Sequence, residues 1–425
     1  MSVIVASHIL ILYYHSGSLR SVRAAIRHHL LALESVQPQE RLIYFNAIHG
    51  APAWLRHLQF RTIVLHTTFL CMRWSRSFSR WKRGLDWIGK LDCTKIALPQ
   101  DEYDHSNVLD EWLDDWAVSV IFTNFGPEYR QQLYPRMRRK AEFYECYTGY
   151  IDEAAAHSYA FKLKPPAARP NIIVYRATHL PYWFGSHGQL KHRIAAVVEE
   201  RARALGLTCD ISTRPQDLIL GDRWLDFLAS SRAVIGCESG SSVLDRRGEL
   251  QAQVRALLKG NPSLTFEQVG AYMPAGWDDY RFLAISPRHF EAVITKTCQI
   301  LVEGHYNSVL EPDRHYIPLK RDFSNLDEVL AKVQDDGLVT KMVECAYNEI
   351  YLSGQYTYRR LAAELVAAIV ADKSNGVASK RRVSRALWTA GELVASAAAE
   401  LAAARAWVGA KLIRPLRARL YSGNK

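Results

Sequence analysis

The sequence has few cysteines and none of the patterns that make cysteines structural or metal-binding. The seven are scattered and never spaced as C-x-x-C: Cys71, Cys93, Cys146, Cys209, Cys237, Cys298 and Cys345. This odd, irregular set excludes a disulfide framework and a cysteine-based zinc site. We expect the thiols to behave as small apolar side chains in a reducing compartment.

Long apolar runs and a secretory leader are also missing. The opening residues, MSVIVASHILILYYHS, place no basic segment before the apolar stretch, which soon ends in polar residues. No stretch approaches the roughly 18 uninterrupted apolar residues of a membrane-spanning helix. We therefore expect a cytoplasmic protein.

No carboxylate pair has the Asp-x-Asp spacing of a divalent-cation site. The pairs Asp114–Asp115 and Asp335–Asp336 are adjacent and fall in helical surroundings, where solvated faces explain them. We therefore predict that the protein holds no metal and no other cofactor.

The positive charge is concentrated in one segment. The net charge is +11, and residues 380–425 contain ten basic residues against two acidic ones, Glu392 and Glu400. This tail therefore carries +8 and the rest of the chain only +3. A nucleic-acid groove spread over the fold is not indicated, because the basicity belongs to an appendage.

The length and the pattern of apolar runs predict two α/β domains. A chain of 425 residues exceeds the roughly 250–300 residues of a single core. In the first half, strand-like runs alternate with helical patterns, which indicates βαβ units and a parallel sheet. The predicted strands are 9–14, 42–46, 62–68, 95–100 and 119–124, with helices at 19–33 and 108–116.

The same alternation starts again after a proline-rich break. The segment 162–170 contains three prolines and several basic residues, and we interpret it as the linker between domains 1–161 and 171–354. The second half predicts strands at 171–175, 208–212, 233–237 and 299–302, and helices at 191–205, 222–230, 288–295, 325–335 and 338–353. We expect the segment 355–372 to form a helix that packs back across the domains. Two Rossmann-like domains facing across a cleft follow from this pattern, and ligands bind such sheets beyond the carboxyl ends of the strands.

The clearest chemical motif is a helix start in the second domain, Ile285-Ser-Pro-Arg-His-Phe-Glu-Ala292. Serine and proline favour a helix N-terminus, whose free N–H groups suit a diphosphate. Arg288 would add a bidentate phosphate contact, and Glu291 could accept hydrogen bonds from ribose hydroxyls. The alternative is that both side chains merely decorate an exposed helix.

The stretch 284–323 resembles bacterial glycosyltransferases of the GT-B fold, especially the CgeB-like group that acts on surface polysaccharides. The resemblance rests on the segments FEA, EGHYNSVLEP and HYIPLKRDF, and it extends over most of 95–365. It implies that Glu291 contacts the donor ribose and that nearby basic residues hold the diphosphate. It also marks Glu303, Gly304 and Lys320, which lie in these segments, as donor-binding residues.

The chain departs from that family at one position. Many retaining enzymes of the GT-B fold have a second glutamate eight residues before the one that matches Glu291, where this chain has Leu283. The resemblance therefore does not decide between retention and inversion.

Two further loops in the second domain are candidate parts of a donor site. Glu238, Ser239 and Gly240 open a Gly/Ser-rich turn after a strand, where a ligand can approach the backbone closely. The loop 181–188 is rich in aromatic residues and glycine and precedes Lys191, a candidate phosphate ligand. A solvated turn and simple packing of the aromatic side chains are the alternatives.

The first domain has an acidic cluster at the predicted end of a strand, QDEYDH. An inverting transferase needs a base near the acceptor hydroxyl, and Asp101, Glu102 or His105 could serve. A capping cluster for the next helix is the alternative. His66, at the end of another predicted strand, is a weaker candidate of the same kind.

These observations predict a metal-independent glycosyltransferase that takes a sugar from a nucleoside-diphosphate donor and transfers it to a glycan or lipid-linked acceptor in surface polysaccharide synthesis. A non-catalytic homologue acting as a scaffold in a polysaccharide assembly complex is the second hypothesis. We expect no nucleic-acid partner. The tail 380–425 predicts a basic amphipathic helix, which would lie on an anionic membrane at its inner face or pair with a second copy.

Overall fold

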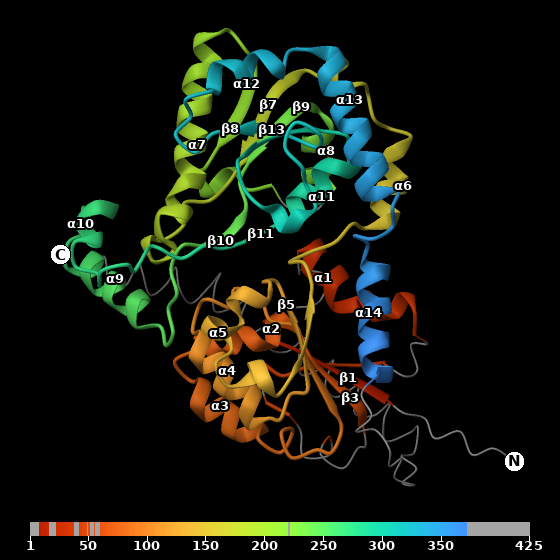
Figure 1. Ribbon diagram of the computed structural model, residues 1–425, viewed down its shortest axis with the longest axis vertical. Helices are drawn as coiled ribbons and strands as arrows, with labels where there is room; N and C mark the ends of the chain where they lie inside the picture. Colours follow the sequence, from red (N-terminus) through yellow and green to blue (C-terminus); the bar gives the residue numbers. More distant parts are fainter. Residues whose placement is uncertain are drawn as a thin grey trace, which may run out of the picture.

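The computed structural model describes residues 8–16, 23–37, 42–48, 50–51, 55, 60–219 and 222–371. It consists of two α/β domains stacked one above the other (Figure 1). The predicted amphipathic tail, residues 380–425, lies outside the described residues. Among the helices that the structure describes, none combines the length and apolarity needed to cross a bilayer.

The N-terminal domain is built on a six-stranded parallel sheet with the strand order β2-β1-β3-β4-β5-β6. Its strands are β1 (His8–Tyr13), β2 (Leu42–Asn46), β3 (Phe60–Leu65), β4 (Thr94–Ala97), β5 (Val120–Thr123) and β6 (Glu142–Glu145). Every residue of β4 and β5 is buried, because helices cover both faces of the sheet. The sequence predicted five of these strands and missed β6, whose residues are half-buried or exposed.

The two faces of this sheet carry different helices. On one face lie α2 (Thr67–Leu70), α3 (Phe78–Leu85), α4 (Ser106–Asp115) and α5 (Arg130–Leu133). Aromatic rings join them, and the Phe69 and Trp112 ring centroids are 5.4 Å apart. The other face is covered by α1 (Ala24–Leu31) and α14 (Tyr358–Ala371), so the last described helix returns to the first domain.

The C-terminal domain has a five-stranded parallel sheet with the order β13-β12-β9-β7-β8. Its strands are β7 (Asn171–Arg176), β8 (Cys209–Ser212), β9 (Ser231–Gly236), β12 (Cys298–Val302) and β13 (Ile317–Leu319). The helices are α7 (Gly185–Ala204), α8 (Asp222–Ala229), α11 (Pro287–Ile294), α12 (Leu326–Lys332) and α13 (Asp336–Ala346). The predicted arrangement of two Rossmann-like domains is confirmed.

Residues 239–284 leave the second domain and pack on the first, and we call them the arm. The arm starts and ends in an antiparallel ribbon of β10 (Ser239–Ser241) and β11 (Phe282–Ala284), and holds α9 (Glu249–Gly260) and α10 (Phe266–Gly270) between them. It protrudes beside the first domain in Figure 1. Phe282 is fully buried among core residues of that domain, and Asp245 N donates to the Tyr103 carbonyl at 3.0 Å. The sequence did not predict the arm.

The chain crosses between the domains earlier than the predicted linker. Helix α6 (Glu153–Ala160) already packs on the second domain, where Tyr159 Oη donates to Asp226 Oδ1 at 2.5 Å. The segment 162–170 lies against the same domain and is anchored by Arg169, which is 6% exposed. Residues 162–170 therefore form a rigid strap against the second domain. The chain passes from the first domain to the second just after β6.

Candidate functional site

The carboxyl ends of the strands of both sheets meet at the interface between the domains. Asn307, after β12, donates from Nδ2 to the carbonyl of Asn124, after β5, at 3.2 Å. Thr148 Oγ1, after β6, donates to the carbonyl of Ile285 at 2.9 Å. Ligands bind open α/β sheets at this end, so the interface is where a site is expected.

The loop after β12 has a strained backbone at this interface. Tyr306, Asn307 and Ser308 have φ angles of 46°, 51° and 56°. Asparagine tolerates this left-handed region, whereas tyrosine and serine adopt it at a cost. Such strain persists only where surrounding contacts hold it, and it clusters at functional sites.

Glu238 supplies one of the contacts that hold this loop. Its side chain is 4% exposed, and Oε1 accepts a hydrogen bond from Tyr306 N at 2.7 Å. A Cβ at Gly304 would overlap Oε2, so glycine is required there. Burial raises the pKa of Glu238, and the backbone hydrogen bonds oppose this shift. In this geometry Glu238 shapes the loop, and its assignment to the donor site stays a prediction.

Basic side chains gather at the carboxyl ends of β7, β9 and β12. Burial raises the pKa of the Cys237 thiol to about 11, and Lys191, Arg321 and Arg288 act in the opposite direction. Burial lowers the pKa of His187 to about 4, with contributions from Lys191, Arg321 and Arg281. Within the ranges that the structure describes, none of these four cations forms an ion pair. We call Lys191, Arg281, Arg288 and Arg321 the cation cluster.

Lys191 lies at the centre of the cluster. It is half-buried, and burial lowers its pKa, with a further lowering from Arg288 and an opposite effect of Asp101. The Asp101 carboxylate of the first domain therefore lies close enough to act on this ammonium group. Half-buried cations without carboxylate partners favour binding of an anion.

Arg288 and Glu291 form one wall of the site with Trp224 of α8. The Arg288 guanidinium carbon lies 4.8 Å from the Trp224 ring centroid, and its Nη1 donates to the Arg176 carbonyl at the end of β7. Trp224 Nε1 donates to Glu291 Oε2 at 2.7 Å. Burial raises the pKa of Glu291. Trp224 is buried and orients the half-buried Glu291 carboxylate, which suits the ribose of a nucleoside.

The two predicted helix starts are partly occupied by the protein's own groups. At α11, Ser286 N donates to His289 Nδ1 at 2.9 Å in a capping box. At α7, Ser186 N donates to Asp278 Oδ1 at 2.8 Å. Helix α7 begins at Gly185, so part of the predicted loop 181–188 is helix, and a carboxylate of the arm already occupies its N-terminus.

The three candidate bases of the first domain point in different directions. Asp101 is exposed, with φ of 49°, and Oδ1 accepts from Tyr103 Oη at 2.7 Å. Glu102 is fully buried inside the domain. The His105 ring lies against Gly248 of the arm, and its Nδ1 is 2.6 Å from Asp104 Oδ1. Of the three, Asp101 is therefore the one placed near the cation cluster.

Glu102 is a buried structural carboxyl. It accepts hydrogen bonds from Thr123 Oγ1 at 2.6 Å, from Asn124 N at 2.7 Å and from Tyr134 Oη. Burial raises its pKa to about 7, and these hydrogen bonds oppose the shift. The folded protein therefore holds a proton at Glu102 over a pH range in which the unfolded chain has lost it.

This shift predicts a pH-dependent stability. Because the pKa of Glu102 is raised in the folded protein, its contribution to stability is fully present at pH values below 4.5, the pKa in the unfolded chain. This contribution is lost as the pH rises towards 7. Between pH 5 and pH 8, the stability of the wild type should fall by about 2 kcal/mol relative to that of Glu102→Gln, which cannot titrate. Urea unfolding of both proteins at the two pH values measures this difference. A difference that does not change with pH would contradict the raised pKa.

The remaining predicted donor residues are spread over the loops around the cluster. Ser239 and Gly240 belong to β10, and Gly240 has φ of 121°. A Cβ there would overlap the Phe282 carbonyl, so this glycine is needed for the ribbon. Glu303 is exposed at the end of β12. Lys320 is also exposed and acts on Asp322 and Glu328, away from the cluster.

His66 has a structural role in this fold. Its Nδ1 accepts a hydrogen bond from Thr68 N at 3.2 Å and caps α2, and its Nε2 is 3.0 Å from Nδ1 of the buried His29. Desolvation holds its pKa well below the usual value. This arrangement explains the histidine without a ligand.

Sequence reasoning missed Arg281 and Arg321. Arg281 lies in the arm just before β11, and Arg321 follows β13, next to the predicted Lys320. Both are exposed side chains in loops, and such arginines carry no periodic signal. Only the basic residues beside a strand end, 320–321, gave a hint.

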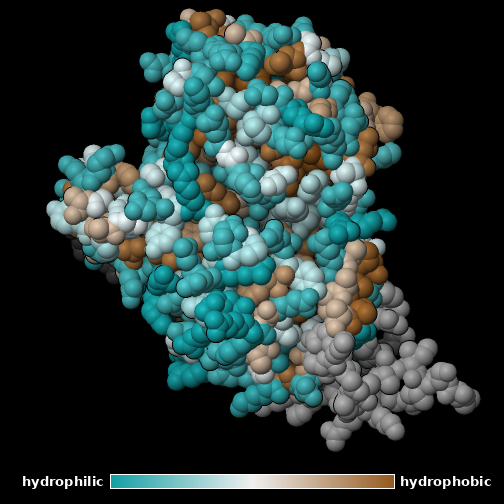
Figure 2. All heavy atoms as spheres, in the orientation of Figure 1, coloured by the Kyte–Doolittle hydropathy of each residue, from teal (hydrophilic) through white to brown (hydrophobic). Residues whose placement is uncertain are grey.

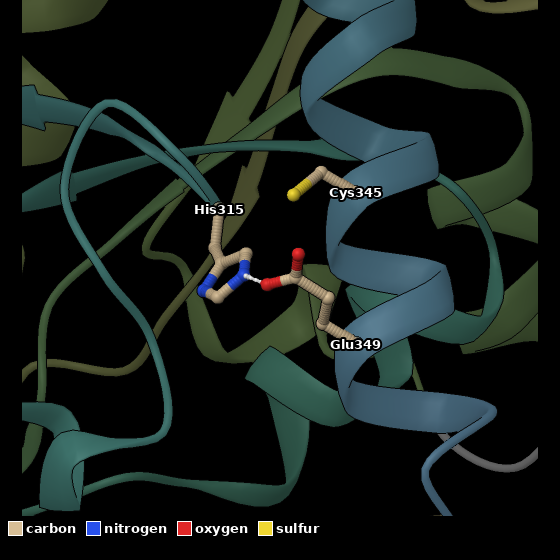
Figure 3. Close-up of side chains that lie close together, drawn as sticks. All are labelled: His315, Cys345 and Glu349. Carbon is tan, nitrogen blue, oxygen red and sulfur yellow. Dashed lines mark hydrogen bonds and ion pairs between the residues drawn. The ribbon is translucent and has the colours of Figure 1, made fainter.

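A separate cluster in the second domain has side chains typical of a metal site, but their ligand atoms already form hydrogen bonds within the protein. His315, Cys345 and Glu349 place their ligand atoms within 4.8 Å of one another, and Figure 3 shows His315 and Glu349 pointing towards each other. His315 Nδ1 accepts from Glu311 N at 3.1 Å, so Nε2 carries the proton that it donates to Glu349 Oε2 at 2.9 Å. Arg314 donates to both oxygens of Glu349, at 2.8 and 2.6 Å. These atoms are therefore already engaged, and a guanidinium occupies the place of a cation.

No protein-family model matches the chain, and no curated protein matches it either. Several solved structures are similar to it over most of its length. They include an α-glucosyltransferase in complex with UDP (TM-score 0.47, 10% identity, 86% of this chain and 100% of that one). T4 phage BGT in complex with UDP-glucose is another (0.46, 11%, 87% and 100%). HepE of Anabaena in complex with UDP-glucose is a third (0.42, 11%, 85% and 99%).

Proposed function

We propose that the protein is a metal-independent glycosyltransferase that binds a nucleoside-diphosphate sugar at the interface between its domains. The observation that carries this proposal is the cation cluster, four basic side chains that form no ion pair within the described residues and lie near the carboxyl end of β9. Four cations in one place match the charge of a diphosphate.

The cluster would serve the departure of the nucleoside diphosphate. Breaking the bond between the sugar and the diphosphate places negative charge on the leaving oxygen. Lys191, Arg288 and Arg321 all act on the Cys237 thiol, so their charges lie together where they would stabilise the leaving oxygen. Charge stabilisation by side chains is the chemistry that a divalent cation would otherwise supply.

The wall formed by Trp224 and Glu291 would hold the nucleoside. One Glu291 oxygen is fixed by Trp224 Nε1 at 2.7 Å, which orients the carboxylate. The other oxygen accepts no hydrogen bond from the described residues and is the acceptor we assign to a ribose hydroxyl. The pKa of Glu291 is raised by burial, so hydroxyl donors that bind its charged form would compensate for the desolvation.

Asp101 is the residue we assign as the base in an inverting transfer. Its carboxylate lies across the interface from Lys191 and is exposed, so it can reach an acceptor hydroxyl. It would remove the proton of that hydroxyl as the oxygen attacks the sugar. The acceptor we propose is a glycan or lipid-linked glycan of surface polysaccharide synthesis, made at the cytoplasmic face of the membrane.

A scaffold without turnover is the second candidate function. Leu283, which stands where many retaining enzymes have a glutamate, pairs with Gly240 in the β10–β11 ribbon. Donor binding without transfer or hydrolysis would distinguish the scaffold from the enzyme.

Isothermal titration calorimetry with a panel of nucleoside diphosphates and nucleotide sugars tests the donor site. We expect the double variant Arg281→Gln, Arg321→Gln to bind the preferred nucleotide about 100-fold more weakly, since each charged hydrogen bond contributes about 1.5 kcal/mol. Both arginines are exposed, so the fold should tolerate the change.

The matched control is Arg138→Gln, Arg139→Gln, which removes the same charge from exposed positions after α5. It should bind like the wild type. Equal weakening in both variants would show only a general charge effect, and absence of any binding by the folded wild type would reject the donor site.

A further inference from the structure

A groove runs between the arm and the first domain, outside the proposed donor site. Its volume is about 920 Å³, and it is lined by α3 and α4 on one side and by α9 on the other. This volume lies near the upper end of the range of roughly 300–1,000 Å³ for ligand sites. The surface of the lower domain beside α9 is mostly hydrophilic in Figure 2.

The groove carries more positive charge than its own carboxylates can balance. Among the lining acids, Asp115 pairs with Lys82, Glu111 pairs with Arg247, and Asp86 accepts from Trp116 Nε1 at 3.3 Å. The exposed cations left without an ion pair in the described part of the chain are Arg76, Arg83, Arg255 and Lys259. Two face the groove from the first domain and two from α9.

Aromatic side chains lie between these charges. Trp74 is 36% exposed and stacks on Arg73, whose guanidinium carbon is 4.4 Å from the ring centroid. Phe78 is half-buried and also lines the groove. Aromatic surface beside cations and hydrogen-bonded carboxylates offers stacking, ionic and hydroxyl-accepting contacts in one place.

The groove is joined to the loop that holds Asp101. The Arg73 guanidinium is buried in the groove wall and donates to the carbonyls of Asp101 at 2.8 Å and of Asp104 at 2.9 Å. Arg73 thus fixes the position of the loop against the groove. A chain lying in the groove would have one end near the proposed base.

We propose that this groove binds the acceptor as an acidic glycan, a chain whose carboxylate or phosphate groups are separated by neutral sugars. This inference rests on the proposed function. A sparsely charged chain suits four unmatched cations interspersed with Asp86, Glu111 and Asp115, because the sugar hydroxyls can donate to these carboxylates. A nucleic acid, with one phosphate per nucleotide, would meet the same carboxylates with repulsion.

Fluorescence anisotropy with a labelled hyaluronan oligosaccharide, in which glucuronate alternates with neutral N-acetylglucosamine, tests the groove. The variant Arg83→Ala, Arg255→Ala, Lys259→Ala should bind this probe about tenfold more weakly than the wild type, because three exposed ionic contacts are lost. The salt dependence of its binding should also be weaker. A neutral maltooligosaccharide of the same length should bind much more weakly to both proteins.

The variant Arg138→Ala, Arg139→Ala, Lys341→Ala is the matched control, since it removes three exposed cations elsewhere. All proteins keep the basic tail, so a general attraction to it is the same in each. Unchanged binding of the hyaluronan oligosaccharide by the groove variant would overturn the proposal. Tighter binding of single-stranded DNA, lost in the same variant, would also overturn it in favour of a nucleic acid.

Calorimetry with the nucleotide separates this inference from the donor site. The groove variant should bind the nucleotide like the wild type, because none of its changes is in the cation cluster. If no nucleotide binds while the hyaluronan oligosaccharide still binds in the groove, the proposed function fails and the glycan site stands.

Discussion

Replacing Asp101 by asparagine should lower the turnover number for sugar transfer about 1,000-fold, the size typical of losing a positioned general base. Nucleotide affinity should change little, since the change is on the opposite domain from the aromatic wall. Asparagine tolerates the left-handed backbone of this position, φ of 49°, and its amide oxygen can still accept from Tyr103 Oη. Initial rates with saturating donor, together with calorimetry, measure both effects.

The matched control is Asp92→Asn, an exposed carboxylate at the opposite end of β4 from Asp101. It should keep full turnover. A variant of Asp101 with normal turnover would remove this residue from the mechanism, and a wild type that binds the nucleotide without any turnover would favour the scaffold. These two outcomes can be told apart, because the scaffold is tested by measuring turnover of the wild type alone.

The sequence predicted the buried parallel strands best. The bounds of β2 are the predicted ones, and β7, β9 and β12 differ from the prediction by one or two residues. Strands covered on both faces need apolar residues at successive positions, so they appear as short apolar runs. The edge strand β6, with an exposed glutamate at each end, has no such run and was missed.

The arm could not be predicted from local patterns. Its two strands have three residues each, and they are separated by residues 242–281. What stabilises them is the burial of Phe282 and Leu244 in the core of the other domain. Such a contact depends on the relative position of the domains, which no local pattern contains.

For the candidate site, the sequence predicted some of the residues but not how their side chains are arranged. Lys191 and Arg288 were found because each lies near a helix start that follows a strand. Glu238 was also found, but its position in the sequence does not reveal that the carboxylate turns towards Tyr306 N. Arg281 and Arg321 come from separate loops, and only the tertiary structure brings their charges to His187.

Arg169 shows most clearly why the predicted linker is a structural strap. Its guanidinium donates to the carbonyls of Ser231 at 2.9 Å and Thr295 at 3.0 Å, and to Thr297 Oγ1 at 3.1 Å. Nε donates to the carbonyl of Lys164 at 3.0 Å and closes the strap on itself. Burial lowers the pKa of Arg169 to about 10, so the group remains charged at neutral pH.

Arg169→Ala should therefore lower the free energy of unfolding by about 3 kcal/mol, because buried carbonyl acceptors lose their donor and no side chain fills the space. Urea unfolding followed by tryptophan fluorescence measures this loss. Arg203→Ala removes an exposed arginine paired with Glu199 and should change stability by no more than about 0.5 kcal/mol. A flexible linker would make the two variants alike, so equal stabilities would contradict the strap. A loss confined to Arg169→Ala is the result expected of a segment anchored on the second domain.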